Sequence, residues 1–295
     1  MEAAIDALRR TRLAAHTRRS YGYVIAAFAR WLEQTGGSIE SLAEGDLRSY
    51  KARLKDVLRR RPATINHQVQ ALRWLCRWAQ GREILKADLS AGAEFERVPP
   101  RRRPANLAEG EVHRLIRAAG QGRPTHRARD YAILQLLLQA GLRVGEAVSL
   151  KVADITLYER SGVVRVRFGK GGKEREVPLN ISARRALRAY LDTRPGPEPE
   201  EPLFLSQQRR PMSARMVEHL VGVLSSRAKL ETPATPHRLR HTFAINYLRE
   251  HPGNLVQLRE LLGHESVDTT AIYTQPSTEE LAAQLEASQF NVFER

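Results

Sequence analysis

The chain has 295 residues and carries 48 Lys and Arg residues against 33 Asp and Glu residues, a formal net charge of +15. Its hydrophobic content of 42% is enough to bury a core. No apolar run approaches the roughly 20 residues of a bilayer span, and the N-terminus lacks the features of a signal peptide. We therefore expect a cytoplasmic protein, and the length favours two domains over one.

The charge indicates the class of partner. So basic a chain usually binds a polyanion, most often nucleic acid. The excess of arginine over lysine suits forked contacts with phosphates, although a GC-rich coding bias would also produce it. The single cysteine, Cys76, excludes an internal disulfide framework and a cysteine-rich metal site. Composition therefore predicts a nucleic-acid partner but no chemistry.

Residues 1–98 are predicted to form a module of four or five helices. Three stretches keep apolar residues at helical spacing: 21–32, 47–58 and 65–76. Pro62 separates the second stretch from the third. We expect Trp74 and Trp78 to make core or domain contacts rather than to stack on bases, and Cys76 to be a small buried apolar residue.

A linker is predicted at residues 99–105, because its prolines cannot continue a helix. It contains Arg101, Arg102 and Arg103. These arginines fit a solvated hinge, and they equally fit a segment that follows the DNA backbone between two domains.

Residues 106–295 mix helices with a β-hairpin. Apolar stretches at 112–120 and 128–140 predict helices, and Gly141 takes the usual C-terminal glycine position of the second. Alternating residues on both sides of a Gly-Lys-Gly-Gly-Lys turn predict two antiparallel strands, at 163–168 and 175–179. The remainder is expected to be helical apart from an acidic, proline-rich loop, so the fold class is mainly α with a small β-sheet.

One helix start forms a candidate anion site. Thr235 is a good N-cap and Pro236 a good first helical residue, which places His237, Arg240 and His241 on one face at the positive end of the helix dipole. A basic helix start on the surface is the simpler interpretation. Zinc is disfavoured, because no Glu follows His237 as in HExxH and Arg240 would occupy the metal position.

Three further positions could carry chemistry. Arg143 comes shortly after the helix-ending Gly141, and Glu146 is close enough in sequence to pair with it or with another cation. A solvated arginine is also common after a helix cap. Lys170 lies in the glycine-rich turn, which is not a P-loop and could be a plain hairpin tip. His264 follows Gly263, a predicted helix cap, and Tyr273 lies in a short segment where packing is the usual role.

Together these residues resemble the tyrosine recombinases, the lambda-integrase superfamily. The resemblance covers the whole chain and rests on the motifs GLRVGEAVSL, GKGGKEREVPL, HRLRHTFA and LLGHESVDTTAIYT. Length and layout look most like the Xer recombinases. The resemblance implies an N-terminal helical, SAM-like domain that clamps DNA (1–98) and a C-terminal α+β catalytic domain (106–295).

The resemblance also implies roles for single residues. Arg143 and Arg240 would clamp the phosphate, with Lys170 as the hairpin lysine and Lys173 as its rival. His237 and His264 would complete the phosphate site, Tyr273 would be the nucleophile, Glu146 would support the site, and His241 would be structural. Contacts to DNA are expected from the following residues: Arg101, Arg102, Arg103, Lys173 and Arg175.

The implied reaction is attack by Tyr273 on a DNA phosphodiester, giving a 3′-phosphotyrosyl link without ATP. Two arginines would hold the charge of the transition state, so no metal and no other cofactor is expected. The resemblance implies that the tail, about 278–295, contacts a neighbouring protomer, a second copy or a paralogue, in a tetramer. A helix folded back on its own domain is the alternative for this tail. The alternatives are a type IB topoisomerase-like enzyme and a non-catalytic DNA-binding regulator.

Overall fold

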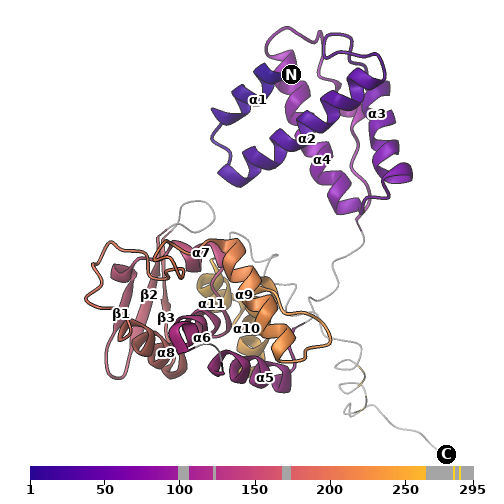
Figure 1. Cartoon of the computed structure of the whole chain (residues 1–295). Coiled ribbons are helices and arrows are strands. Elements are labelled where there is room, and N and C mark those ends of the chain that lie inside the picture. Colours follow the sequence, from indigo (N-terminus) through magenta and orange to yellow (C-terminus); the bar gives the residue numbers. More distant parts are fainter. Residues whose placement is uncertain (99–105, 122–123, 168–173, 264–281, 283–285, 287–295) are drawn as a thin grey trace, which may run out of the picture. The chain divides into compact units, whose positions relative to one another are not determined.

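The computed structural model describes residues 1–98, 106–121, 124–167 and 174–263, together with the single helical positions 282 and 286. The chain divides into two compact units, Met1–Pro100 and Arg101–Arg295 (Figure 1). Each described unit has its own apolar core. Within the described ranges, no helix is both long and apolar enough to span a bilayer.

The first unit is built from helices. They are α1 (Glu2–Arg9), α2 (Ala15–Gln34), α3 (Glu44–Ala52) and α4 (Pro62–Gln80), with a π-helical turn (Arg53–Val57) after α3 and a 3-10 turn (Leu89–Gly92). The three helices predicted from apolar spacing are confirmed. Pro62 is the first residue of α4, where a missing backbone N–H costs nothing.

The core of this unit lies between α1, α2, α3 and α4. Cys76 is fully buried in it, and burial raises the pKa of the Cys76 thiol to about 12. The rings of Trp74 and Trp78 stack with their centroids 6.5 Å apart and pack on the same core. The predicted buried role of Cys76 and the core contacts of the two tryptophans are therefore confirmed.

The second unit combines helices with a small sheet. Its helices are α5 (Glu109–Gly120), α6 (Pro124–Gln139), α7 (Val144–Ser149), α8 (Ile181–Leu191), α9 (Ala214–Arg227), α10 (Pro236–Glu250) and α11 (Leu255–Leu262), with a 3-10 turn at Val152–Asp154. Its strands are β1 (Ile155–Leu157), β2 (Gly162–Val166) and β3 (Arg175–Pro178). The expected fold class, mainly α with a small β-sheet, is confirmed.

The sheet is antiparallel in the order β1-β2-β3. Val164 pairs with Val177 across the predicted hairpin, and both side chains are buried in the core. β1 was not predicted, because three residues are too few to show an alternating pattern. Its Ile155 pairs with Val164 on the other side.

Helix α6 forms the centre of the unit and packs against α5, α8 and α10. It is buried on almost every side from Ala132 to Leu138. Gly141 follows it with φ +59°, and a Cβ at this position would lie 2.3 Å from Cδ1 of Phe243 in α10. Only glycine permits both this backbone conformation and this close approach, so Gly141 fixes where the chain leaves α6 and enters α7.

Candidate active site

The first part of the site is the start of α7. Oε2 of Glu146 accepts the backbone N–H of Arg143 at 2.8 Å, which caps the helix. Oε1 of the same carboxylate accepts Nη1 of Arg143 at 2.7 Å. The pairing that the sequence spacing indicated is therefore present, and Glu146 binds both the backbone N–H and the guanidinium group of Arg143.

The second part comes from α10. Oγ1 of Thr235 accepts the backbone N–H of Arg238 at 3.1 Å, and Pro236 is the first helical residue, so the predicted helix start is confirmed. Arg240 is 3% exposed. Its Nη1 donates to the carbonyl of Gly141 at 2.6 Å, and its Nη2 donates to the carbonyl of Leu262 at 2.6 Å. Arg240 thus ties the end of α6 to the end of α11.

The C-terminal end of α11 anchors both arginines. The carbonyl of Leu262 also accepts Nη1 of Arg143 at 3.3 Å, and the carbonyl of Gly263 accepts Nη2 of Arg143 at 3.1 Å. Gly263 has φ +62°, the left-handed conformation of a helix cap. Because the last carbonyls of a helix carry partial negative charge, this end stabilises two cations side by side.

Arg175, for which a DNA contact is predicted, makes its bonds within the protein in this structure. It donates through Nη1 and Nη2 to Glu146 at 3.0 and 2.8 Å, and through Nε to the carbonyl of Leu261 at 2.9 Å. Arg175 is the first residue of β3 and lies two residues before the buried Val177. Because side chains alternate along a strand, Arg175 and Val177 lie on the same face, which is the face that packs against the protein. That alternation was visible in the sequence and is the signal that would have placed it.

Glu146 gathers these cations in a buried position. It is 4% exposed, and Oε2 lies 3.7 Å from Nη1 of Arg240. Burial alone would raise the pKa of Glu146, but the hydrogen bonds and charge of Arg175, with the donors of Arg143, outweigh burial and lower this pKa below its ordinary value. The carboxylate is therefore ionised at neutral pH.

Helix α10, which carries Arg240, also carries two histidines, His237 and His241. His237, in the first turn, is exposed, whereas His241 is half-buried. Their ring centroids are 4.0 Å apart with an edge-on angle of 71°. Among the described residues, no group of three or more His, Cys, Asp and Glu side chains is placed to hold a metal ion.

Several predicted site residues lie outside the described residues. Lys170 and Lys173 belong to the segment between β2 and β3, while His264 and Tyr273 follow α11. The linker arginines Arg101, Arg102 and Arg103 are also outside the described ranges. The structure thus brings together Arg143, Glu146, Arg175 and Arg240.

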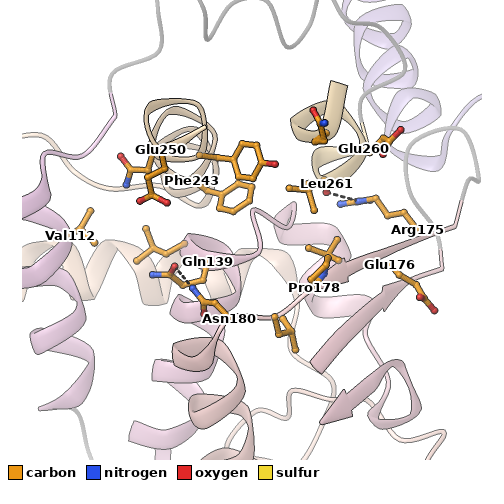
Figure 2. Close-up of a pocket in the computed structure, with 16 residues that line it drawn as sticks. Val112, Gln139, Arg175, Glu176, Pro178, Asn180, Phe243, Glu250, Glu260 and Leu261 are labelled. Carbon is orange, nitrogen blue, oxygen red and sulfur yellow. Dashed lines mark hydrogen bonds between the residues drawn. The ribbon is translucent and has the colours of Figure 1, made fainter. Parts of the chain in front are cut away.

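A cavity of about 960 Å³ lies beside the arginine network, between the end of α6, β3, α10 and α11 (Figure 2). Its lining is mixed, with apolar side chains such as Leu138, Phe243 and Leu261 and carboxylates such as Glu250 and Glu260. Among the described residues, its lining includes Arg175 but neither Arg143 nor Arg240. The carboxylates of this lining would repel a phosphate.

Two family models match the chain. The phage integrase family matches residues 105–280, and the phage integrase N-terminal SAM-like domain matches residues 1–86. The chain belongs to the phage integrase family. The residues that meet in the arginine network all lie within the matched region of the second unit.

Named relatives in this family are tyrosine recombinases. XerD of Ralstonia nicotianae is 35% identical over 274 residues, which covers 91% of this chain and 86% of that protein. XerA of Thermococcus kodakarensis is 35% identical over 271 residues, covering 90% and 86%. A solved structure of the XerH site-specific recombinase bound to its difH substrate aligns with a TM-score of 0.71 at 21% identity, covering 92% and 79%. The tyrosine recombinase resemblance, most like the Xer type, is confirmed.

Proposed function

We propose that this protein is an Xer-like site-specific recombinase that cuts and rejoins duplex DNA through a phosphotyrosyl intermediate. The observation that carries the proposal is the pairing of Arg143, the N-cap residue of α7, and Arg240, from α10, on Glu146 and on the carbonyl of Leu262. Two forked cations held this rigidly suit the non-bridging oxygens of one phosphate. The two relatives that are 35% identical to this chain are named tyrosine recombinases.

The arginines would supply most of the rate acceleration. Attack on a phosphodiester adds negative charge to the non-bridging oxygens, and preorganised donors stabilise that charge without reorganising. An arginine so placed is worth on the order of 10³–10⁵ in the rate of phosphoryl transfer. Because Glu146 and the helix end hold Arg143 and Arg240 before DNA binds, little reorganisation would be needed at the moment of reaction.

Tyr273 would be the nucleophile. Its phenol, with an ordinary pKa of about 10, needs help to lose its proton at neutral pH. The arginines proposed to bind the same phosphate would favour the phenolate, and His237, exposed on the first turn of α10, would accept the proton. Lys170 would protonate the leaving 5′-oxygen, and His264 would complete the phosphate site. The covalent link would keep the energy of the broken bond, so rejoining would need no ATP.

The two units would divide the work on DNA. Residues 1–98 would clamp the duplex, residues 99–105 would connect the units, and residues 106–295 would hold the chemistry. The net charge of +15 supports binding to a polyanion. The tail, about 278–295, would contact a neighbouring protomer in a tetramer with a second copy or a paralogue, acting at the nucleoid.

Two other functions fit the site and the named relatives less well. A type IB topoisomerase-like enzyme would use related chemistry to relax DNA, but the relatives named above are recombinases. A non-catalytic DNA-binding regulator would have no need for two arginines fixed on one buried carboxylate. Resolution of chromosome or plasmid dimers and integration or excision of a mobile element are all compatible with the recombinase proposal.

The test is covalent capture of genomic DNA. The protein is incubated with fragments of its own genome that carry random single-strand nicks, which let the released strand diffuse away, and covalent complexes are isolated in detergent and sequenced. We expect fragments that share one sequence. Tyr273→Phe should capture none while still binding those fragments, and Tyr158→Phe, an exposed tyrosine of the same unit, should act like the wild type.

The outcomes separate the three functions. Capture of fragments without a common sequence, together with relaxation of any supercoiled plasmid, would indicate the topoisomerase. Binding without any covalent link would indicate the regulator. A Tyr273→Phe variant that still formed the covalent link to DNA would show that Tyr273 is not the nucleophile.

A further inference from the structure

The position of Arg175 suggests a role that its exposed neighbours on β3 do not have. Its side chain is 11% exposed, whereas that of Glu176, the next residue, is 60% exposed. Its nitrogens Nε, Nη1 and Nη2 all donate within the protein (Figure 2 shows the bond to Leu261). Arg240 is also buried, but its fork binds two carbonyls, whereas a phosphate contact by Arg175 would require breaking a bidentate pair with a buried carboxylate.

Glu146 connects Arg175 to the two clamping arginines. Its Oε1 accepts Nη1 of Arg175 at 3.0 Å and Nη1 of Arg143 at 2.7 Å. Its Oε2 accepts Nη2 of Arg175 at 2.8 Å and lies 3.7 Å from Nη1 of Arg240. Each carboxylate oxygen is therefore shared between Arg175 and a clamping arginine, so the orientation of the carboxylate depends on Arg175.

A second connection runs through the end of α11. Arg175 binds the carbonyl of Leu261, and Arg143 and Arg240 both bind the carbonyl of Leu262. Gly263 has φ +62°, and a Cβ there would lie 2.7 Å from Nη1 of Arg175. Arg175 thus lies directly against the helix end that orients the other two guanidinium groups.

We propose that Arg175 is a positioning residue of the recombinase site, which holds Glu146 and the end of α11 so that Arg143 and Arg240 point in the directions that the phosphate requires. The inference rests on the proposed function. Arginine is needed at this position because its fork makes two parallel bonds to the carboxylate and a third to a carbonyl. Lysine keeps the charge but is a point donor that cannot reproduce this geometry.

The experiment separates DNA affinity from the rate of cleavage. Arg175→Lys and Arg175→Ala are compared with the wild type on a genomic fragment captured as described above. Affinity is measured over a range of salt concentrations, and cleavage is measured in single turnover with all the DNA bound. Arg165→Ala is the matched control, because Arg165 lies on the neighbouring strand β2 and forms only exposed ion pairs, with Glu174 and Glu176, among those described.

We expect the rate of cleavage to fall about 10- to 100-fold in both Arg175 variants, as for a displacement of catalytic groups by about 1 Å. DNA affinity and its salt dependence should stay close to those of the wild type, and Arg165→Ala should cleave at the wild-type rate. If Arg175→Ala does not fold, Arg175→Lys carries the test, because it preserves the charge and most of the side-chain volume.

A double-mutant cycle then tests whether Arg175 acts through Glu146. Adding Arg175→Lys to Glu146→Gln should lower the rate much less than it does in the wild type, since residues of one network are not additive. All variants are measured at a temperature at which circular dichroism shows them folded. Additive effects would overturn the proposed route through Glu146.

Two other results would overturn the inference. The first is unchanged cleavage in both variants. The second is weaker binding with an unchanged rate and a loss of about one from the slope of log affinity against log salt, which would make Arg175 a phosphate contact. If the wild type itself captures no DNA, the proposed function fails, whereas wild-type capture with either result above removes only the role of Arg175.

Discussion

Two carboxylates, one in each unit, gather several cations in different ways. In the first unit, Glu96 is 18% exposed and pairs with Nζ of Lys51 at 3.0 Å and Nζ of Lys55 at 3.2 Å. In the second unit, Glu146 is 4% exposed and pairs with three arginines. Both carboxyl groups have a lowered pKa, for Glu96 because of hydrogen bonds from the two lysines.

The backbone around each carboxylate explains the difference. The main chain of Glu96 is held by Asn66, which accepts its N–H at 2.6 Å and donates to its carbonyl at 2.8 Å. The lysines add to a segment that is already fixed. Glu146, in contrast, is itself the common partner that orients Arg143, Arg175 and Arg240. Lysine ammonium groups fasten a segment, whereas arginine forks on a buried carboxylate define directions.

The largest expected effect is on the stability of the second unit. Glu146→Gln should lower the free energy of unfolding by about 3–5 kcal/mol, because it leaves buried guanidinium groups without their counter-charge. Urea denaturation followed by circular dichroism measures this loss. Glu176→Gln is the matched control, because Glu176 lies on β3, the strand that carries Arg175. This change removes an exposed ion pair with Arg165 and should lower the free energy of unfolding by less than about 1 kcal/mol.

Equal losses in the two variants would show that the arginine network contributes no more than a surface ion pair. The buried Glu146 would then contribute no more to stability than the exposed Glu176, and the positioning role of Arg175 would lose its physical basis.

The second effect is a dependence on pH. Since the pKa of Glu146 is lowered by folding, its ionised form adds stability that is fully present above the unfolded value of about 4.3 and is lost as the pH falls below it. The gap in unfolding free energy between wild type and Glu146→Gln should therefore be constant between about pH 5 and 7 and should narrow below about pH 4. Denaturation at a series of pH values measures the gap, and a constant gap down to pH 3 would contradict the ionised network.

The smallest effect is expected in the first unit. Glu96→Gln removes both lysine pairs but leaves the main-chain bonds to Asn66, so it should cost less than about 1 kcal/mol, and added salt should reduce the cost further. Asn66→Ala removes the main-chain bonds instead and should cost about 1–3 kcal/mol. If Glu96→Gln were the more harmful change, the lysine pairs and not Asn66 would hold this segment.

Much of the local structure could be predicted from the sequence. The cap at Thr235 and the first-turn Pro236 defined the start of α10, and Gly141 and Gly263 marked the ends of α6 and α11. These signals are reliable because each depends on a few neighbouring residues and on their backbone angles. The pairing of Arg143 with Glu146 has the same origin, since it closes a single helical turn.

Other features could not be predicted from the sequence, for physical reasons. The strand β1 is too short to show alternation and is recognisable only by its pairing with β2. A DNA contact was predicted for Arg175; its alternation with Val177 showed which face of β3 it shares, but not that Glu146 and the end of α11 lie against that face. Charge is a property of the residue alone, whereas burial depends on which elements cover that face.

The sequence by itself determined the family, the helical elements and the residue types of the site. Only the tertiary structure decided which groups meet at Arg240, because its two carbonyl partners, Gly141 and Leu262, belong to the ends of different helices. The same holds for the two sides of Glu146, where Arg143 comes from the adjoining turn and Arg175 from β3. Local rules place each residue on its own element, and the packing of α6, α10, α11 and the sheet brings them to one carboxylate.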